Sequence, residues 1–319
     1  MLRLAEVRRS IETIVAVACL AGCSAGPLAA PPGSASQAVL AAFRPDAQFY
    51  GNDFVYTTHP DGNDVTVYAR KGLSLTFLDT LSLDVAAPQG IVATPSSWFY
   101  LANSGDSNIL IYRSTRQGPK GPRATLDDSG EVPVNVSVTP DRGLIAVSNG
   151  TSAGSGTGSV SVYVSGSKPS RILTYGSDLL QGEGVAIDPQ GNCYWSFNDL
   201  SNPSTLGSIV EFESCNGNGT LIVSGITSPG GMAFDQSGDL YYVDEASGIY
   251  KCRQISNCAL FATGFGLPTN INFDAKAKDL WVADATGYID AVNPETGAIE
   301  NQIVSVGGAP YGIAPSPGN

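Results

Sequence analysis

The chain has little of the chemistry on which hydrolases and metalloenzymes commonly depend. It holds a single histidine, His59, which stands in a turn-like Thr-His-Pro-Asp-Gly stretch. One histidine leaves few ways to build a Ser/His/Asp or Cys/His catalytic group, and it argues against a catalytic zinc site. The Gly-rich segment 150–158 lacks the Gly-Lys-Ser/Thr ending of a phosphate-binding loop. These absences disfavour nucleophilic, zinc-dependent and nucleotide-dependent mechanisms.

Charged residues are also scarce, and basic residues most of all. Only 14% of the 319 residues are charged, with 17 Lys and Arg against 29 Asp and Glu, so the net charge is −12. Such a surface repels nucleic acid and anionic lipid headgroups, and we expect neither as a partner. Gly (37) and Pro (20) are abundant instead. This balance favours many short strands joined by tight turns over helices with solvated faces.

The apolar run near the start is too short to be a permanent membrane span. Three Arg residues precede the run 14–20, which ends in the sequence Leu-Ala-Gly before Cys23. This ending resembles the bacterial lipobox, and the resemblance implies that Cys23 is lipidated and becomes the mature N-terminus. The alternative is an ordinary secretory signal that is cleaved a little later, near 29–30.

We therefore divide the chain into three parts. Residues 1–22 form a lipoprotein signal peptide, residues 23–46 form a flexible tether rich in Ala, Pro, Ser and Gly, and residues 47–319 form one folded domain. Loss of the signal peptide, which holds three Arg and two Glu, changes the net charge from −12 to −13. We expect an extracytoplasmic protein, periplasmic or at the cell surface, that meets the membrane only through its lipid.

Four cysteines lie in the folded domain. Cys252 and Cys258 flank five residues, a spacing that places them opposite each other across a hairpin, and Cys193 and Cys215 fall on two successive strands. An even count in an exported chain favours disulfides over a metal site, which would need further His or Cys ligands. We predict the pairs Cys193–Cys215 and Cys252–Cys258.

One phrase recurs along the domain: Pro or Gly, any residue, Gly or Asn, an alternating apolar run, then in most copies Asp or Thr. The copies are Pro88–Thr94, Pro133–Thr139, Gly182–Asp188, Pro229–Asp235, Pro268–Asp274 and Pro310–Ala314. Successive copies start 39 to 49 residues apart. Further short strands follow each of the first five, as in Leu240–Asp244. A period of about 40–50 residues with about four strands per unit is typical of a β-propeller.

The sixth copy has no strands after it, and its missing partners lie at the other end of the domain. Phe54–Thr58 and Val65–Ala69 resemble the second and third strands of a repeat. We therefore expect an all-β, six-bladed β-propeller in which N- and C-terminal strands share the closing blade. The domain then holds about 45 residues per blade. Five or seven blades are the alternatives.

The repeats resemble NHL and YVTN-type propellers of the TolB-like kind and, more loosely, the senescence-marker-protein/gluconolactonase family. The resemblance is best at 229–244, where the phrase continues as Gly-x-Leu-Tyr-Tyr-Val-Asp. It covers most of the mature chain and is specific for architecture but poorly specific for function.

In such propellers, the residue after each opening Pro or Gly should face one mouth of the central channel. These mouth candidates are Gln89, Val134, Glu183, Gly230, Thr269 and Tyr311. The gluconolactonase resemblance implies a divalent cation held by Glu, Asn and Asp oxygens from such positions. Here the ring offers one carboxylate, and Gly230 stands where that family has the ligand Asp. We therefore expect no catalytic residues, no cofactor and no metal, with a weak calcium site at Glu183 as the less favoured alternative.

The sequence favours a lipid-anchored binding or scaffold protein, expected to be a monomer, whose mouth takes an unknown peptide, glycan or protein. The alternative is a metal-dependent, lactonase-like hydrolase with a degenerate site. The Asn and Asp residues that close the second strands could form a ring of ligands. Such residues more often bond to nearby backbone at strand ends and turns, and we expect that role here.

Overall fold

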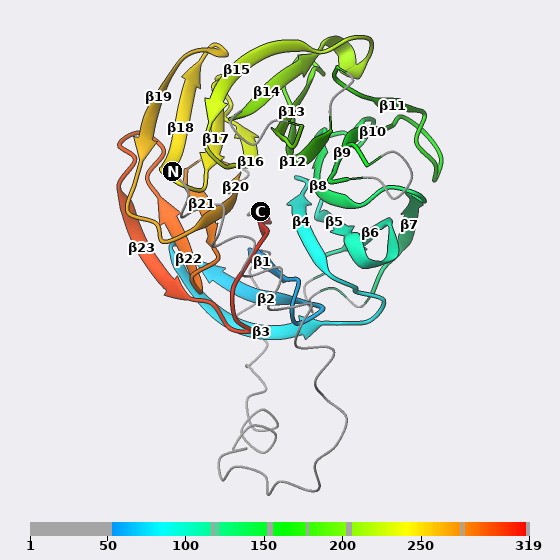
Figure 1. Cartoon of the computed structure of the whole chain (residues 1–319). Helices are drawn as coiled ribbons and strands as arrows, with labels where there is room; N and C mark the ends of the chain where they lie inside the picture. Colours follow the sequence, from blue (N-terminus) through cyan, green and yellow to red (C-terminus); the bar gives the residue numbers. More distant parts are fainter. Residues whose placement is uncertain are drawn as a thin grey trace, which may run out of the picture. The chain divides into compact units, whose positions relative to one another are not determined.

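The structure is a computed structural model. It describes residues 53–316, apart from 116–118, 120, 152–155, 177–178, 202–205, 275 and 277. The predicted signal peptide and tether, including Cys23, lie outside the described residues. Those residues form six four-stranded antiparallel sheets arranged around a central axis, so the predicted all-β, six-bladed propeller is confirmed (Figure 1). No helix within the described part meets the length and apolarity that a membrane crossing needs.

We number the blades along the chain and give each from its inner to its outer strand. Blade 1 consists of β4 (Pro88–Ala93), β5 (Trp98–Asn103), β6 (Asn108–Arg113) and β7 (Ala124–Asp127). Blade 2 consists of β8 (Pro133–Val138), β9 (Ile145–Asn149), β10 (Ser159–Tyr163) and β11 (Arg171–Leu173). Blade 3 consists of β12 (Leu180–Ile187), β13 (Cys193–Asp199), β14 (Gly207–Phe212) and β15 (Thr220–Ile226).

The remaining blades follow the same plan. Blade 4 consists of β16 (Pro229–Phe234), β17 (Leu240–Asp244), β18 (Gly248–Arg253) and β19 (Ser256–Ala262). Blade 5 consists of β20 (Pro268–Phe273), β21 (Leu280–Asp284), β22 (Tyr288–Val292) and β23 (Ile299–Val304). Blade 6 consists of β24 (Ile313–Pro315), β1 (Phe54–His59), β2 (Asp64–Lys71) and β3 (Ser74–Leu81). Two short 3-10 turns, Ser104–Asp106 and Glu213–Cys215, follow β5 and β14.

Blade 6 closes the ring as the sequence predicts. Its inner strand β24 pairs antiparallel with β1, with Tyr56 opposite Ala314 and Thr57 opposite Ile313. In Figure 1 the red C-terminal strand lies beside the blue N-terminal strands of the same sheet. This pairing covers the edge of β1 with the C-terminal strand and joins the two ends of the domain.

The core consists of apolar layers between neighbouring blades. Each of six buried clusters joins residues of two adjacent blades, so both faces of a blade contribute to the core. Between blades 6 and 1, for example, the Phe99 ring stacks between Tyr56 and Tyr112, with centroids 4.3 and 4.6 Å away. Trp195 and Trp281 are fully buried. Stacked aromatic pairs of this kind add about 0.5–1.5 kcal/mol beyond the area that they bury.

The acidic residue that ends the recurring phrase closes the turn to the second strand. The Asp188 carboxylate accepts the backbone N–H groups of Gln190 and Asn192, and Asp235 accepts those of Ser237 and Asp239. A carboxylate that accepts two backbone N–H groups stabilises the tight turn between two antiparallel strands. The phrase therefore ends in Asp or Thr for a structural reason.

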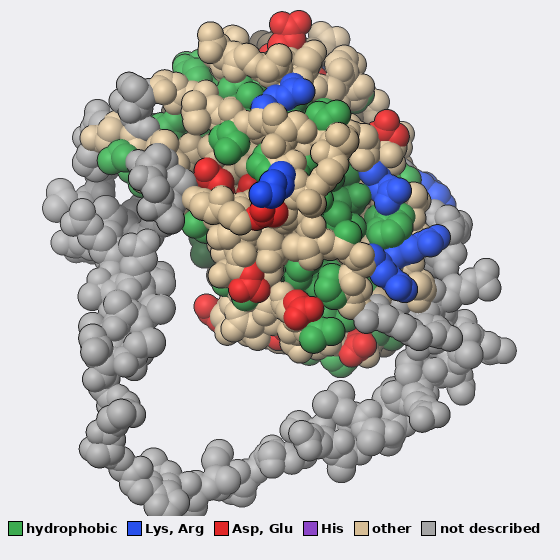
Figure 2. Space-filling model, turned by 90° about the vertical axis from the view of Figure 1, so that its right-hand side faces the viewer, with side chains coloured by type: hydrophobic (Ala, Val, Ile, Leu, Met, Phe, Trp, Pro, Cys, Tyr) green, Lys and Arg blue, Asp and Glu red, His purple; other side chains and the backbone are tan. Residues whose placement is uncertain are grey.

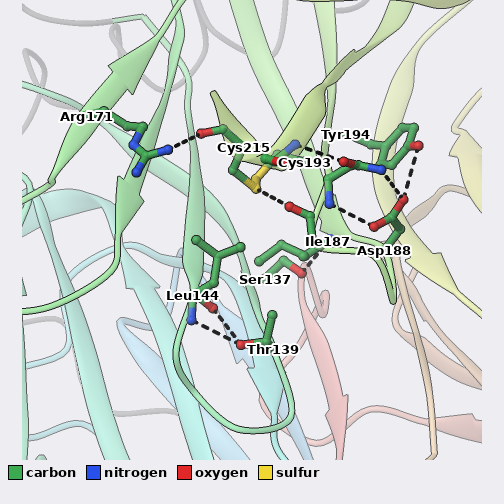
Figure 3. Close-up of a disulfide and its surroundings, with 12 residues drawn as sticks. Ser137, Thr139, Leu144, Arg171, Ile187, Asp188, Cys193, Tyr194 and Cys215 are labelled. Atoms are coloured by element: carbon green, nitrogen blue, oxygen red, sulfur yellow. Dashed lines mark hydrogen bonds between the residues drawn. A yellow bond between two sulfur atoms is a disulfide. The ribbon is translucent and has the colours of Figure 1, made fainter. Parts of the chain in front are cut away.

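Both predicted disulfides are present. Cys252 and Cys258 form a cross-strand pair between β18 and β19, as the spacing indicates. Cys193 begins β13, but its partner Cys215 lies in the 3-10 turn after β14 rather than on that strand. Figure 3 shows this bond beside the Asp188 turn, where the Cys215 carbonyl accepts a hydrogen bond from the Arg171 guanidinium.

Candidate functional site

The central channel is surrounded by the inner strands of the blades. Each of β4, β8, β12, β16, β20 and β24 is the first strand of its sheet and pairs along only one edge. The other edge of each inner strand faces the axis, so backbone N–H and C=O groups border the channel. Figure 1 shows these strands grouped near the centre of the ring and β3, β7, β15, β19 and β23 at its rim.

The six mouth candidates lie at equivalent places, at or just before the beginning of the inner strands. Gln89, Val134, Gly230 and Thr269 are the second residues of their strands, Glu183 is the fourth residue of the longer β12, and Tyr311 precedes β24. Gln89 and Tyr311 are half-buried, and the other four are buried. Their use as ligand contacts stays a prediction.

The inner strands touch one another through their backbones at this level. A Cβ at Gly184 would lie 2.3 Å from the Gly230 carbonyl oxygen, and a Cβ at Gly312 would lie 2.3 Å from that of Gln89. Real Cβ atoms do not approach oxygen so closely, so only glycine allows these strands to pack side by side. The glycine of the phrase therefore brings neighbouring inner strands into backbone contact.

Hydroxyl groups join the same inner strands across blade boundaries. Thr58 Oγ1 accepts the Gly312 N–H (2.7 Å) and donates to the Gln89 carbonyl (2.5 Å). Ser196 repeats this arrangement between the Gly184 N–H and the Gly230 carbonyl, at 2.8 and 2.9 Å. The backbone carbonyls of Gln89 and Gly230 therefore already accept hydrogen bonds that link neighbouring blades. This limits their capacity to bind a ligand.

Glu183 is the one carboxylate among the mouth candidates. It is 7% exposed and its Oε1 accepts a hydrogen bond from Asn198 Nδ2 at 2.9 Å. A hard divalent cation requires several converging oxygen ligands, but the equivalent positions carry Val134, Gly230 and Thr269. Among the described residues, no group of three or more His, Cys, Asp or Glu side chains could hold a metal ion. The donors at this mouth do not fit the cation that the gluconolactonase resemblance implies.

Asp244 and Asp284, at the ends of their second strands, have the structural role that we expected, whereas Asn149 donates to the side-chain hydroxyls of Ser159 and Ser161. The Asp244 carboxylate accepts backbone N–H groups of Thr227, Ser228 and Ala246. Asp284 accepts those of residues 266, 267 and 286. Burial alone would raise the pKa of Asp284, but these bonds and the Thr286 hydroxyl together lower it. The carboxylates thereby hold the connection that leads into each inner strand.

His59 occupies the corresponding position in blade 6. It is 2% exposed, and its ring nitrogens lie 3.2 Å from the Ala309 carbonyl and from the Thr57 hydroxyl. Burial lowers its pKa, while Asp64 and the Ala309 carbonyl raise it. The single histidine of the chain therefore links the connection before β24 to β1, as Asp244 and Asp284 link the connections before β16 and β20 to their second strands.

A hollow bordered by the inner strands lies toward the opposite ends of these strands from the mouth candidates. It has a volume of about 150 Å³ and is bordered by residues from the second halves of the inner strands, including Val136, Ala186, Met232 and Phe273. Its polar borders are Asn and Ser side chains. Asn272 spans one side, because its amide nitrogen donates to the carbonyls of Ile91 and Ile313 at 3.2 and 2.6 Å. None of the residues that border this hollow carries a charge.

The described Lys and Arg residues gather on one side of the ring, where acidic residues such as Asp188, Asp235 and Asp274 also lie. The described Lys and Arg residues lie in, or within two residues of, connections from first to second or third to fourth strands: Arg70, Lys71, Arg113, Arg123, Arg142, Lys168, Arg171, Lys251, Arg253, Lys276 and Lys278. In an antiparallel meander these connections point to one side. Figure 2 shows a group of them at its right-hand edge.

The opposite side, which we call the acidic face, is built from the second-to-third-strand connections and the connections between blades. The sequence places no Lys or Arg in any of these connections. Its described acidic residues are Asp61, Asp84, Asp106, Asp128, Glu131 and Glu245. The mouth candidates lie where the inner strands begin, on this same side. The channel mouth that the sequence singled out therefore opens onto a face of one charge.

Comparison with known proteins places the fold but not the activity. No family model matches the chain, and no curated protein matches it either. A functionally unknown protein from Desulfotomaculum acetoxidans is 14% identical with a TM-score of 0.58, over 84% of this chain and 100% of that one. A structure described as a "putative 6-phosphogluconolactonase" from Bacteroides fragilis is 15% identical (TM-score 0.57, 82% and 98%).

The calcium-binding protein regucalcin from Agrobacterium tumefaciens is 14% identical, with a TM-score of 0.53 over 71% of this chain and 77% of that one. At these identities the likeness is one of fold. The chain is thus a six-bladed β-propeller that resembles regucalcin and 6-phosphogluconolactonase structures. The finer assignment to NHL, YVTN or TolB-like repeats stays a prediction.

Sequence reasoning missed the absence of Lys and Arg from one face and the residues that border the hollow. The first was available in principle, because alternate connections of a meander point to opposite sides once the strands are placed. The second depends on how far apart the inner strands lie at each level, which no single residue reveals.

Proposed function

We propose that this protein is an exported, lipid-anchored binding protein whose acidic face docks a basic peptide or protein. The observation that carries the proposal is that the connections of this face hold acidic residues but no Lys or Arg. They surround a mouth at which glycines bring the inner strands into backbone contact. Surfaces of one sign attract partners of the other sign and speed their encounter. The backbone contacts leave little room for a small-molecule site, so a surface contact fits the acidic face better than a buried active site does.

Binding of a lysine-rich decapeptide tests the proposal, with a neutral Gly/Ser decapeptide as the comparison. We expect measurable binding of the basic peptide at low ionic strength and weaker binding as salt is added, because salt screens exposed charges over about 10 Å at 0.1 M. Calorimetry or fluorescence anisotropy would measure both. Equal binding of the two peptides, or binding that is indifferent to salt, would contradict the proposal.

Matched triple variants locate the contact. One variant neutralises three exposed acids of the acidic face, Asp61→Asn, Asp84→Asn and Asp106→Asn. The control neutralises three exposed acids outside that face, Glu213→Gln, Glu295→Gln and Glu300→Gln. Both change the net charge by the same amount, so only a local effect separates them. We expect the first to weaken peptide binding much more than the second.

The lactonase alternative makes a different prediction. Metal-dependent hydrolysis of a sugar lactone that Glu183→Gln abolishes would overturn a purely binding role. The donor set at the mouth argues against this outcome, since Glu183 is the one carboxylate among its six positions. Purified wild-type protein, with and without divalent cations, is sufficient for the assay.

The lipid anchor is tested separately. Replacing Cys23 by Ser should move the protein from the membrane fraction to the soluble extracytoplasmic fraction, because a cleaved lipoprotein is held only by its acyl chains. Unchanged fractionation would remove the anchor from the proposal. It would leave the binding face untouched.

A further inference from the structure

A cluster of oxygen-bearing side chains is buried between blades 1 and 2, away from the channel. The turn between β7 and β8 supplies Asp128 and Glu131, because the Glu131 N–H donates to the Asp128 carbonyl and folds the turn. β9 supplies its last residue, Asn149, and β10 supplies Ser159 and Ser161. Asp128 is 1% exposed, and Asn149 and Ser161 are fully buried.

The hydrogen bonds within the cluster run in one direction, toward the carboxylates. Asn149 Nδ2 donates to the hydroxyls of Ser159 and Ser161 at 3.0 and 2.9 Å. Ser159 then donates to Glu131 Oε2 at 3.1 Å. Each serine hydroxyl has one hydrogen, so Ser159 has no second hydrogen to offer Asn149.

The other branch ends at Asp128. Tyr163 donates its hydroxyl hydrogen to Asp128 Oδ1 at 2.9 Å, and the Ser161 hydroxyl next to this carboxyl also favours its charged form. Despite these donors, burial raises the pKa of Asp128, and the nearby Asp127 adds to the rise. The two carboxylates also repel each other electrostatically. Burial raises the pKa of Glu131, and the negative charge of Asp128 raises it further.

Two acceptor atoms in this cluster remain without a donor. In the described part of the chain, neither Asp128 Oδ2 nor Asn149 Oδ1 has a hydrogen-bond partner, although both residues are at least 99% buried. A buried oxygen without a partner costs about 1–3 kcal/mol, and more when it carries charge. The protein therefore holds two buried, unpartnered oxygens within a hydrogen-bonded network that includes two carboxyl groups.

Among the described residues, no basic side chain forms an ion pair with Asp128 or Glu131. The nearest ion pair that the described residues form is that of Lys168 with Asp127, at 3.7 Å, and the Lys168 side chain is 80% exposed. Asp128 and Glu131 belong to the acidic face, whose connections hold no Lys or Arg. The described residues therefore supply no positive charge that pairs with this site.

We propose that the cluster is a binding site for a hard divalent cation of the calcium type. Asp128, Glu131, Asn149 and the two serines offer carboxylate, amide and hydroxyl oxygens, the ligands that Ca²⁺ prefers, with water to complete its six to eight positions. A cation here satisfies the orphan oxygens of Asp128 and Asn149 and removes the repulsion between the carboxylates. It joins blade 1 to blade 2 and is independent of the channel and of the proposed partner.

Thermal unfolding in Ca²⁺ tests the site. We expect the Tm of the full-length wild type at pH 7.5 to rise as Ca²⁺ increases from about 0.1 to about 10 mM, because extracellular calcium modules bind with affinities of about 0.1–1 mM. Asp128→Asn should abolish the rise. This variant is expected to fold, because it removes an unpaired buried charge and keeps the side-chain shape. Glu183→Gln is the control, since it removes the channel carboxylate and leaves the cluster intact.

Terbium luminescence tests the position of the ion. Tb³⁺ replaces Ca²⁺ at oxygen sites, and its emission is excited by tyrosine close to it. Because the Tyr163 hydroxyl contacts Asp128, we expect Tb³⁺ emission that Ca²⁺ displaces and that Tyr163→Phe reduces several-fold, with the Ca²⁺-dependent Tm rise retained. Three results would overturn the proposal: no Tm rise in the wild type, a rise that persists in Asp128→Asn, or a rise that Glu183→Gln abolishes.

Discussion

Asp290 is a buried carboxyl group that should make the propeller less stable at neutral pH than in mild acid. It lies in the middle of β22, between Val282 and Gln302 of the neighbouring strands, and is fully buried. Among the described residues, no donor forms a hydrogen bond with either carboxyl oxygen of Asp290. Burial raises its pKa from 3.8 to about 6, with a smaller rise from Asp284, while Gln302 lowers it.

The direction of the effect follows from proton linkage. The carboxyl binds its proton more tightly in the folded than in the unfolded chain, so its stability contribution is complete below about pH 4 and is lost as the pH rises to about 6. At 1.36 kcal/mol per pKa unit, the rise of the Asp290 pKa from 3.8 to about 6 corresponds to about 3 kcal/mol of folding stability. Local water penetration reduces this value, so we expect about 2–3 kcal/mol.

Asp290→Asn removes the ionisation and nearly preserves the shape. The free energy of unfolding, from denaturant titrations at pH 4 and pH 7.5, should show a gain for the variant that is about 2–3 kcal/mol larger at pH 7.5. The comparison between the two pH values cancels the pH-independent cost of burying the amide. An identical difference between variant and wild type at both pH values would refute the argument.

Asp284→Asn provides the control with the opposite sign. Its carboxylate is equally buried but accepts three backbone N–H groups, and its pKa is lowered. A carboxylate of this kind stabilises the fold above the unfolded pKa and loses that contribution as the pH falls. The variant should therefore be less stable than wild type at both pH 7.5 and pH 4, and the deficit should shrink only as the pH falls below about 4.

Three further predictions concern the ring and its links. Truncation before Ile313 removes the inner strand of blade 6, and circular dichroism should show loss of the cooperative thermal transition; a retained transition would contradict ring closure. His59→Gln should flatten the stability loss of the wild type below about pH 6.5, since burial lowers the folded pKa of His59; an unchanged pH profile would contradict this. Replacing Cys252 and Cys258 together by Ala should cost about 2 kcal/mol in denaturant titrations, as expected for a short loop, and no cost would exclude that role.

Much of the fold was predictable because a propeller repeats one local pattern. Period-two alternation and turn residues locate strands, and strands at regular spacing with no partner for the last copy imply that the chain ends meet. Likewise, the spacing of Cys252 and Cys258 implies a hairpin, because residues on adjacent antiparallel strands face each other. The pairing of Tyr56 with Ala314 follows from the same pattern.

The candidate site was less predictable. The mouth positions followed from the repeat, but the backbone contact at Gly184 depends on the distance between two inner strands. No pattern distinguishes Asp290, which lacks a partner, from Asp284, which accepts three backbone donors. Both are acidic residues of one repeat, and only their neighbours in space differ.

By itself, therefore, the amino-acid sequence determined the strands, their order and the closure of the ring, since these depend on residues close in the chain and on a repeated register. Only the tertiary structure decided which charges share a face, which carboxylates are satisfied and that the serines of β10 link Asn149 to the carboxyl groups of Asp128 and Glu131. Ionisation and ligand binding depend on the inverse distance between groups and on their access to water. Both quantities exist only after the blades have packed.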